Sequence, residues 1–117
     1  MATIFHITKR EAWEESSGSD SGSSPYQPEM FPVDGFIHCS TREQVIQVAN
    51  ARFRGQLGLV LLSIDPSLVK AEIVYENLEG GEQLFPHIYG ELNHDAVVNV
   101  SAFQPGADGT FTLPADL

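Results

Sequence analysis

The segment from Leu57 to Asp65 constrains the fold most strongly. It is almost continuously apolar and ends at Asp65-Pro66. The run is far shorter than the roughly 20 apolar residues that a bilayer-crossing helix needs. An apolar residue at nearly every position is instead typical of a short strand that is buried on both faces. We therefore predict a central strand here and expect other parts of the chain to cover both of its faces.

The length of 117 residues fits one ordinary domain. The single cysteine, Cys39, excludes an internal disulfide and fits a reducing compartment. The first six residues lack the basic start and the long apolar segment of a signal peptide. We expect a single domain over residues 1–117, located in the cytoplasm and without a membrane span.

The charge balance limits the partners of the chain. Six basic residues against 16 acidic residues give a net charge of -10, which repels phosphate backbones and anionic membrane surfaces. We therefore expect no generic binding to nucleic acids. A content of 42% apolar and 19% charged residues indicates a globular domain rather than a disordered chain.

The first expected helix covers Lys9 to Glu15 and follows a strand at residues 4–8. Thr8 and Glu11 have the spacing of a capping box at the start of this helix. Residues 16–24 are all Ser, Gly or Asp and can bury nothing. We expect them to form a mobile surface loop, which is either a lid or a tolerated insertion.

A second expected helix follows a strand at residues 35–39. Residues 40–43 form another capping box, and Gly55 supplies a stop. The apolar face of this helix contains Val45, Val48, Ala49 and Phe53. Further strands are expected at residues 71–75 and 97–103. Two helices in the N-terminal half and a strand-rich remainder predict an α+β fold.

One pattern of histidine and hydroxyl occurs twice, as His6 with Thr8 and as His38 with Ser40. Alternation along a strand turns both members of each pair to one face. Each pair precedes an expected helix N-terminus, where free N–H groups suit phosphate or carboxylate. The pattern therefore favours an anionic ligand. Two structural explanations stay open, namely helix capping by the hydroxyls and imidazoles bonded to backbone carbonyls.

Three of the six cations lie within or next to these two segments: Lys9, Arg10 and Arg42. Their position in so acidic a chain also favours an anionic ligand.

The aromatic segment from Phe85 to Gly90 is a second candidate. In an extended conformation it points His87 and Tyr89 the same way. Such a pair suits stacking on a planar ring and hydrogen bonding to its polar edge. The alternative is a packed loop that crosses the sheet, with His87 as a structural link.

Other chemistries find less support. Cys39 is adjacent to His38 and faces the opposite side of the strand, so we expect a small core residue rather than a catalytic thiolate. His87, His94 and Asp95 have no zinc-like spacing, and we assign no metal. The sequence contains neither a dinucleotide-binding glycine fingerprint nor a P-loop.

Several of these segments together resemble the bacterial domain of unknown function 952. They extend over most of the chain: Phe5 to Thr8 with Trp13, Asp34 to Ser40, Val48 to Asn50, Leu61 to Asp65 and Phe85 to Gly90. That family is more distantly similar to the ADP-ribosyltransferase-like fold and to RNA 2'-phosphotransferases. The similarity implies a split, mostly antiparallel sheet, with NAD as a ligand or substrate and no required cofactor.

The resemblance also implies roles for individual residues. His6 and Thr8 would contact the nicotinamide side of NAD, while His38, Ser40 and Arg42 would lie near phosphate or ribose. The candidate catalytic residues are His38 and His6, and the candidate ligand-binding residues are Thr8, Arg10, Ser40, Arg42, His87 and Tyr89.

Three functions stay open at this point. The first is a small NAD-dependent transferase or glycohydrolase. The second is a noncatalytic nucleotide- or anion-binding module. The phosphotransferases carry additional arginines around the histidine, whereas this chain has Gly35 and Phe36 just before Ile37-His38, and no late catalytic glutamate stands out. The third is an acidic protein-interaction domain with structural histidines.

Overall fold

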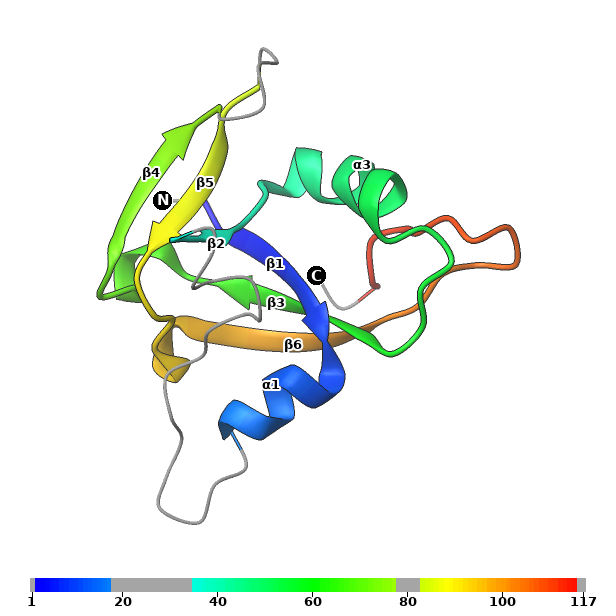
Figure 1. Cartoon of the computed structure of the whole chain (residues 1–117), viewed down its shortest axis with the longest axis horizontal. Coiled ribbons are helices and arrows are strands. Elements are labelled where there is room, and N and C mark those ends of the chain that lie inside the picture. The colour runs from blue at the N-terminus through cyan, green and yellow to red at the C-terminus, as the bar shows by residue number, and fades with distance from the viewer. Residues whose placement is uncertain (1, 18–34, 78–82, 116–117) are drawn as a thin grey trace.

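The computed structural model describes residues 2–17, 35–77 and 83–115, which form an α+β fold with two antiparallel three-stranded sheets (Figure 1). The strand order is β1-β3-β6 in the first sheet and β2-β5-β4 in the second. The elements are β1 (Ile4–Lys9), α1 (Arg10–Ser17), β2 (Ile37–His38), α3 (Arg42–Arg52), β3 (Leu59–Ile64), β4 (Glu72–Glu76), β5 (Phe85–Tyr89) and β6 (Val97–Phe103), with 3-10 helices η1 (Pro66–Leu68) and η2 (His94–Ala96).

The β3 strand is the central strand of the first sheet, as its apolar sequence predicts. All six of its residues are buried, and β1 and β6 flank it in antiparallel register. Val60 and Leu62 belong to an apolar cluster shared with the second sheet, whereas Leu59 and Leu61 belong to a cluster shared with α3. Both faces of β3 are therefore covered, which explains the absence of polar alternation in its sequence.

A backbone bridge between Phe5 and Ser40 joins β1 to the end of the β2 segment. Phe5 and Ser40 exchange two backbone hydrogen bonds of 2.8 Å each. Beyond this bridge β2 pairs with β5 instead, and the Cys39 N–H donates to the Pro86 carbonyl at 2.9 Å. Pro86 has no N–H to donate in return, which helps to keep β2 as short as two residues. The predicted antiparallel pairing is confirmed, whereas the likeness to ADP-ribosyltransferases stays a prediction.

The helix starts differ from those expected. The prediction of a capping box at Thr8 and Glu11 is wrong, because β1 continues through Lys9 and α1 begins only at Arg10. The second helix begins one residue later than expected, with Thr41 as its N-cap. The Thr41 N–H donates to Gln44 Oε1 at 3.0 Å.

Two other expectations are clarified by the fold. Ser16 and Ser17 complete α1, so they are not part of a loop, and the rest of the expected loop at 18–24 lies outside the described residues. The aromatic segment at 85–89 is the strand β5 and not a packed loop. Among the described helices, none has the length and apolar character needed to span a membrane.

Candidate functional site

The register between β2 and β5 places two histidines side by side. His38 lies opposite His87, next to the hydrogen-bonded pair that Cys39 forms with Pro86. Antiparallel ladders alternate, so the pair of histidines is a non-hydrogen-bonded one in which side chains come closest. His38 Nδ1 and His87 Nε2 are accordingly 3.1 Å apart.

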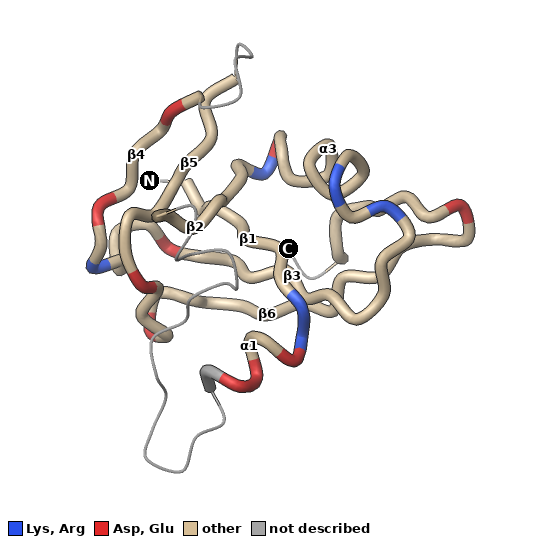
Figure 2. Tube along the Cα trace, viewed as in Figure 1, with Lys and Arg blue, Asp and Glu red and all other residues tan. Residues whose placement is uncertain are grey.

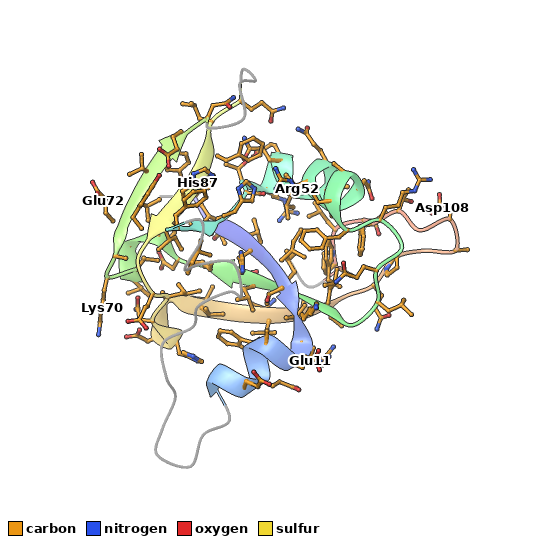
Figure 3. All side chains as sticks on the ribbon, viewed as in Figure 1. Glu11, Arg52, Lys70, Glu72, His87 and Asp108 are labelled. Atoms are coloured by element: carbon orange, nitrogen blue, oxygen red, sulfur yellow. The ribbon has the colours of Figure 1, made fainter. Side chains whose placement is uncertain are left out.

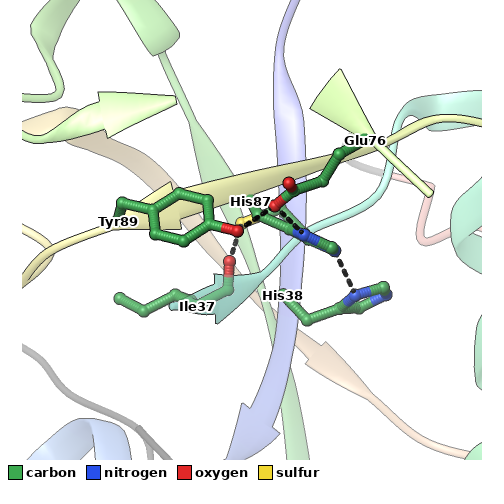
Figure 4. A network of polar contacts seen from close by, with 6 residues as sticks. Ile37, His38, Glu76, His87 and Tyr89 are labelled. Atoms are coloured by element: carbon green, nitrogen blue, oxygen red, sulfur yellow. Dashed lines mark hydrogen bonds and ion pairs between the residues drawn. The ribbon is translucent and has the colours of Figure 1, made fainter. Parts of the chain in front are cut away.

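A carboxylate on β4 continues this contact. Glu76 Oε2 lies 2.9 Å from His87 Nδ1 and also accepts a hydrogen bond from the Tyr89 hydroxyl (Figure 4). The bonds from Tyr89 and His87 hold the pKa of the Glu76 carboxyl below its usual range. Glu76 is therefore ionised at neutral pH, and it raises the pKa of the Tyr89 phenol. We call Glu76, His87 and His38 the histidine relay.

When both imidazoles are neutral, the chemistry of the three groups determines the direction of each hydrogen bond. A carboxylate only accepts, so Nδ1 of His87 carries the proton. Nε2 of a neutral His87 then accepts, and Nδ1 of His38 donates to it. The lone pair of His38 is thereby left on Nε2. This atom is buried and has no hydrogen-bond partner among the described residues.

His6 meets the relay from the first sheet. Because the backbone of His38 turns away from β5, its carbonyl points toward β1 and accepts a hydrogen bond of 2.7 Å from His6 Nδ1. Burial lowers the pKa of His6 to about 4, so its ring is neutral at pH 7. This contact is the imidazole-to-carbonyl bond that the sequence left open as a structural alternative, and it joins the two sheets where their backbones diverge.

A small pocket of about 100 Å³ lies between β1, the region of β2 and the last turn of α3. It is lined by Phe5, His6, Ile7, His38, Ser40, Val48, Arg52 and Phe53. Burial lowers the pKa of His38 to about 4, with smaller contributions from repulsion by Arg52 and by the protonated forms of His87 and His6. His38 is thus a neutral imidazole beside a guanidinium. Figure 3 shows Arg52 on the side of α3 that faces His87.

Aromatic rings shield the relay from water. Phe36 stacks on His87 with ring centroids 4.2 Å apart, and it also contacts Tyr89 at 5.5 Å. Phe85 lies against His38 with centroids 5.3 Å apart. His87 is consequently 3% exposed. Low local polarity strengthens the hydrogen bonds of the relay and raises the cost of leaving His38 Nε2 without a partner.

The structure brings together five of the eight predicted site residues. His6, His38 and Ser40 line the small pocket, while His87 and Tyr89 belong to the hydrogen-bonded network around Glu76.

The other three predicted residues lie elsewhere. Thr8 is buried within β1 opposite Val60. Arg10 lines a depression beside α1, and Arg42 lines a larger cavity at the start of α3. Figure 2 shows basic positions at the start of α1 and at both ends of α3. Arg10 and Arg42 line different pockets, so these two side chains do not converge on one anion.

Three residues of the site were missed from the sequence, namely Glu76, Arg52 and Phe36. Arg52 follows Val45, Val48 and Ala49 at helical spacing. Continuing the apolar face of the helix by one turn would therefore have indicated that Arg52 lies at its end. Glu76 could be assigned to the site only once the register between β4 and β5 was known. Cys39 is a buried core residue, as predicted, and burial raises the pKa of its thiol.

These features define a small α+β domain in which a histidine relay ends at a pocket between two sheets and a helix. The family profile described as "Protein of unknown function (DUF952)" matches residues 7–100, and the chain belongs to this family.

Solved structures of protein CC0527 from Caulobacter crescentus are similar over nearly the whole chain. The X-ray structure has a TM-score of 0.81 and 31% identity, covering 96% of this chain and 95% of that one. The solution NMR structure has a TM-score of 0.77 and 31% identity, covering 100% of this chain and 97% of that one. No curated protein matches the chain significantly.

Proposed function

We propose that the small pocket binds an anionic group of a nucleotide-type ligand, with NAD and ADP-ribose as the candidates, and that His38 exchanges a proton with that group. The observation that carries this proposal is the histidine relay. It ends on a buried Nε2 that has no partner among the described residues, in a pocket that Arg52 also lines. A buried polar atom without a partner is costly, and a ligand atom would satisfy it.

The lining suits one small polar group. Arg52 supplies a positive charge with planar donors, and Ser40 supplies a hydroxyl. A volume of about 100 Å³ is well below the several hundred Å³ of pockets that enclose whole drug-sized ligands. The pocket would therefore take a single phosphate or a single small ring. The remainder of a dinucleotide would lie outside it.

Proton exchange follows from the tautomers of the relay. A ligand hydroxyl or a protonated phosphate would give its proton to His38 Nε2, and the positive charge would then form on the His38 ring. The Nδ1–H bond to His87, itself held by the Glu76 carboxylate, would stabilise that charge. An anion beside Arg52 would also offset one of the charges that lower the His38 pKa. Ligand binding and proton uptake are therefore expected to be coupled.

A noncatalytic binding module is the second candidate, and the pocket lining favours it in one respect. No carboxylate is among the described residues that line the small pocket. Cleavage of NAD at the nicotinamide develops positive charge on the ribose, which a nearby negative group would stabilise. Glu76 is already bonded to His87 and Tyr89. ADP-ribosyl transfer thus has less support than binding.

Amide NMR of the labelled protein tests the binding step. NAD, ADP-ribose and nicotinamide are titrated separately to millimolar concentration, where weak sites begin to fill. We expect shifts at residues 38–40 and 52–53 and in β5. Absence of shifts with all three compounds would refute the nucleotide proposal and leave the protein-interaction domain as the working interpretation.

Two substitutions of His38 separate the roles of its two nitrogens. His38→Asn keeps a donor near the position of Nδ1 and removes Nε2, whereas His38→Ala removes both. If His38 exchanges a proton with the ligand, both variants lose the pH dependence of binding. Nicotinamide release from NAD above that of the blank would exclude a pure binder. Equal release by wild type and His38→Asn would exclude His38 as the catalytic base.

A further inference from the structure

A second and larger cavity lies at the opposite end of α3 from Arg52. Its volume is about 510 Å³, which falls in the range of small-molecule sites. The lining residues come from the N-terminal segment, the start of α3 and the first sheet: Ala2, Thr3, Phe5, Thr41, Arg42, Glu43, Ser63, Val98 and Asn99. Of the residues in the histidine relay, none lines this cavity.

Ser63 gives the first indication of a ligand. It belongs to β3, opposite Phe5 of β1 and Asn99 of β6, and is only 4% exposed. Its Oγ is buried and has no hydrogen-bond partner among the described residues. The pairing of β3 with β6 is irregular between Ser63 and Ile64, a feature that often re-aims a side chain beside a binding site.

The start of α3 gives the second indication. The capping box of α3 engages the N–H groups of Thr41 and Gln44. The N–H groups of Arg42 and Glu43 have no partner one turn earlier in the helix, and they suit an anion. Arg42, the first residue of this 11-residue helix, adds a full positive charge. Glu43, the next residue, lines the same cavity, and its carboxylate would repel a second negative charge on the ligand. Together these groups favour a monoanion over a doubly charged phosphate.

The remaining lining determines the shape of the ligand. Phe5, Ala2 and Val98 provide apolar surface, and Val98 is 57% exposed. Apolar walls with a few convergent polar groups are typical of small-molecule pockets. We propose that this cavity binds a small carboxylate with a compact apolar body, which Arg42 and the Ser63 hydroxyl contact at its charged end.

Benzoate is the probe for this proposal, with benzamide as its neutral counterpart and inorganic phosphate as an anion without an apolar body. In amide NMR titrations we expect benzoate to shift residues 41–43, 63 and 98–99 saturably. We expect benzamide and phosphate to bind at least about tenfold more weakly than benzoate, because benzamide lacks the negative charge and phosphate lacks the apolar body. Equal affinity for benzoate and benzamide, or no saturable shift with benzoate, would overturn the proposal.

Substitutions of the lining residues test which side chains contact benzoate. Arg42→Gln is expected to weaken benzoate about tenfold, and Ser63→Ala to weaken it by a smaller factor. Arg54→Gln is the matched control, because it removes the same charge beyond the other end of α3 and outside the lining. Loss of benzoate affinity in Arg54→Gln equal to that in Arg42→Gln would indicate a nonspecific charge effect and refute the site.

The unliganded stability of Ser63→Ala provides an independent readout. The wild-type hydroxyl is buried and has no partner within the described part of the chain, so its removal should leave the midpoint of thermal unfolding unchanged or raise it. A variant that is equally stable and binds benzoate less tightly supports a ligand contact. A lower midpoint would show that Ser63 serves the fold, which contradicts its assignment to a ligand.

Discussion

Acidification should destabilise the folded protein because His6 is buried in its neutral form. Burial lowers the pKa of His6 from 6.5 to about 4 in the folded state. Between these two values the unfolded chain binds a proton at this position and the folded chain does not. Stability contributed by the neutral ring is therefore fully present above pH 6.5 and is lost as the pH falls toward 4.

The size of this effect follows from the two pKa values. One pKa unit corresponds to about 1.4 kcal/mol, so the complete shift of His6 represents roughly 3 kcal/mol. From pH 8 to pH 5 the expected loss in the free energy of unfolding is about 2 kcal/mol, with a slope of roughly 1 kcal/mol per pH unit at pH 5.5. His38 acts in the same direction, and its partial exposure makes its contribution smaller.

Chemical denaturation followed by circular dichroism at several pH values between 5 and 8 measures this loss. His6→Asn is the control, because its amide can donate to the His38 carbonyl as His6 Nδ1 does and does not titrate. We expect the free energy of unfolding of His6→Asn to fall by about 2 kcal/mol less over this range than that of wild type. Identical pH profiles would show that His6 is not held neutral by burial.

Three further outcomes are expected. Gly90→Ala should lower the free energy of unfolding by about 1–3 kcal/mol, because the added Cβ would lie 2.7 Å from Ala71 Cβ; Ala71→Gly should recover part of the loss. Glu76→Gln should lower the pKa of Tyr89, measured by spectrophotometric titration, because the carboxylate raises it; an unchanged pKa would contradict their hydrogen bond. Cys39 should resist alkylation in native protein at pH 8 and react on unfolding, because burial raises the pKa of its thiol; rapid native labelling would contradict this.

Elements with a strong local pattern could be predicted from the sequence. The apolar run at 57–65 contains β3, and the β-rich segment at 97–103 is β6 with the expected bounds. The buried face of α3 contains Val45, Val48 and Ala49, as its periodicity indicates. In these segments the periodicity of apolar residues along the chain is itself the signal, so no partner segment had to be known.

The helix starts show where local reasoning is insufficient. Ser40 and Thr41 are adjacent hydroxyl residues, and each has an acidic or amide residue three positions later, so two capping boxes were available. The bridge from Ser40 to Phe5 decided between them, because it holds Ser40 in extended pairing and leaves Thr41 to cap α3. At Thr8 the pairing of β1 with β3 likewise overrode the capping pattern.

The histidine relay depends on pairings between distant segments, and this explains why only part of it was predicted. His38 and His87 are 49 positions apart, and the β2-β5 register sets them opposite each other. Glu76 reaches His87 only through the pairing of β4 with β5. A shift of either register by one residue would turn the relay side chains to the apolar face. The residue types at strand ends therefore identify His38 as a candidate site residue. The tautomer that gives His38 a chemical role is determined by the strand register.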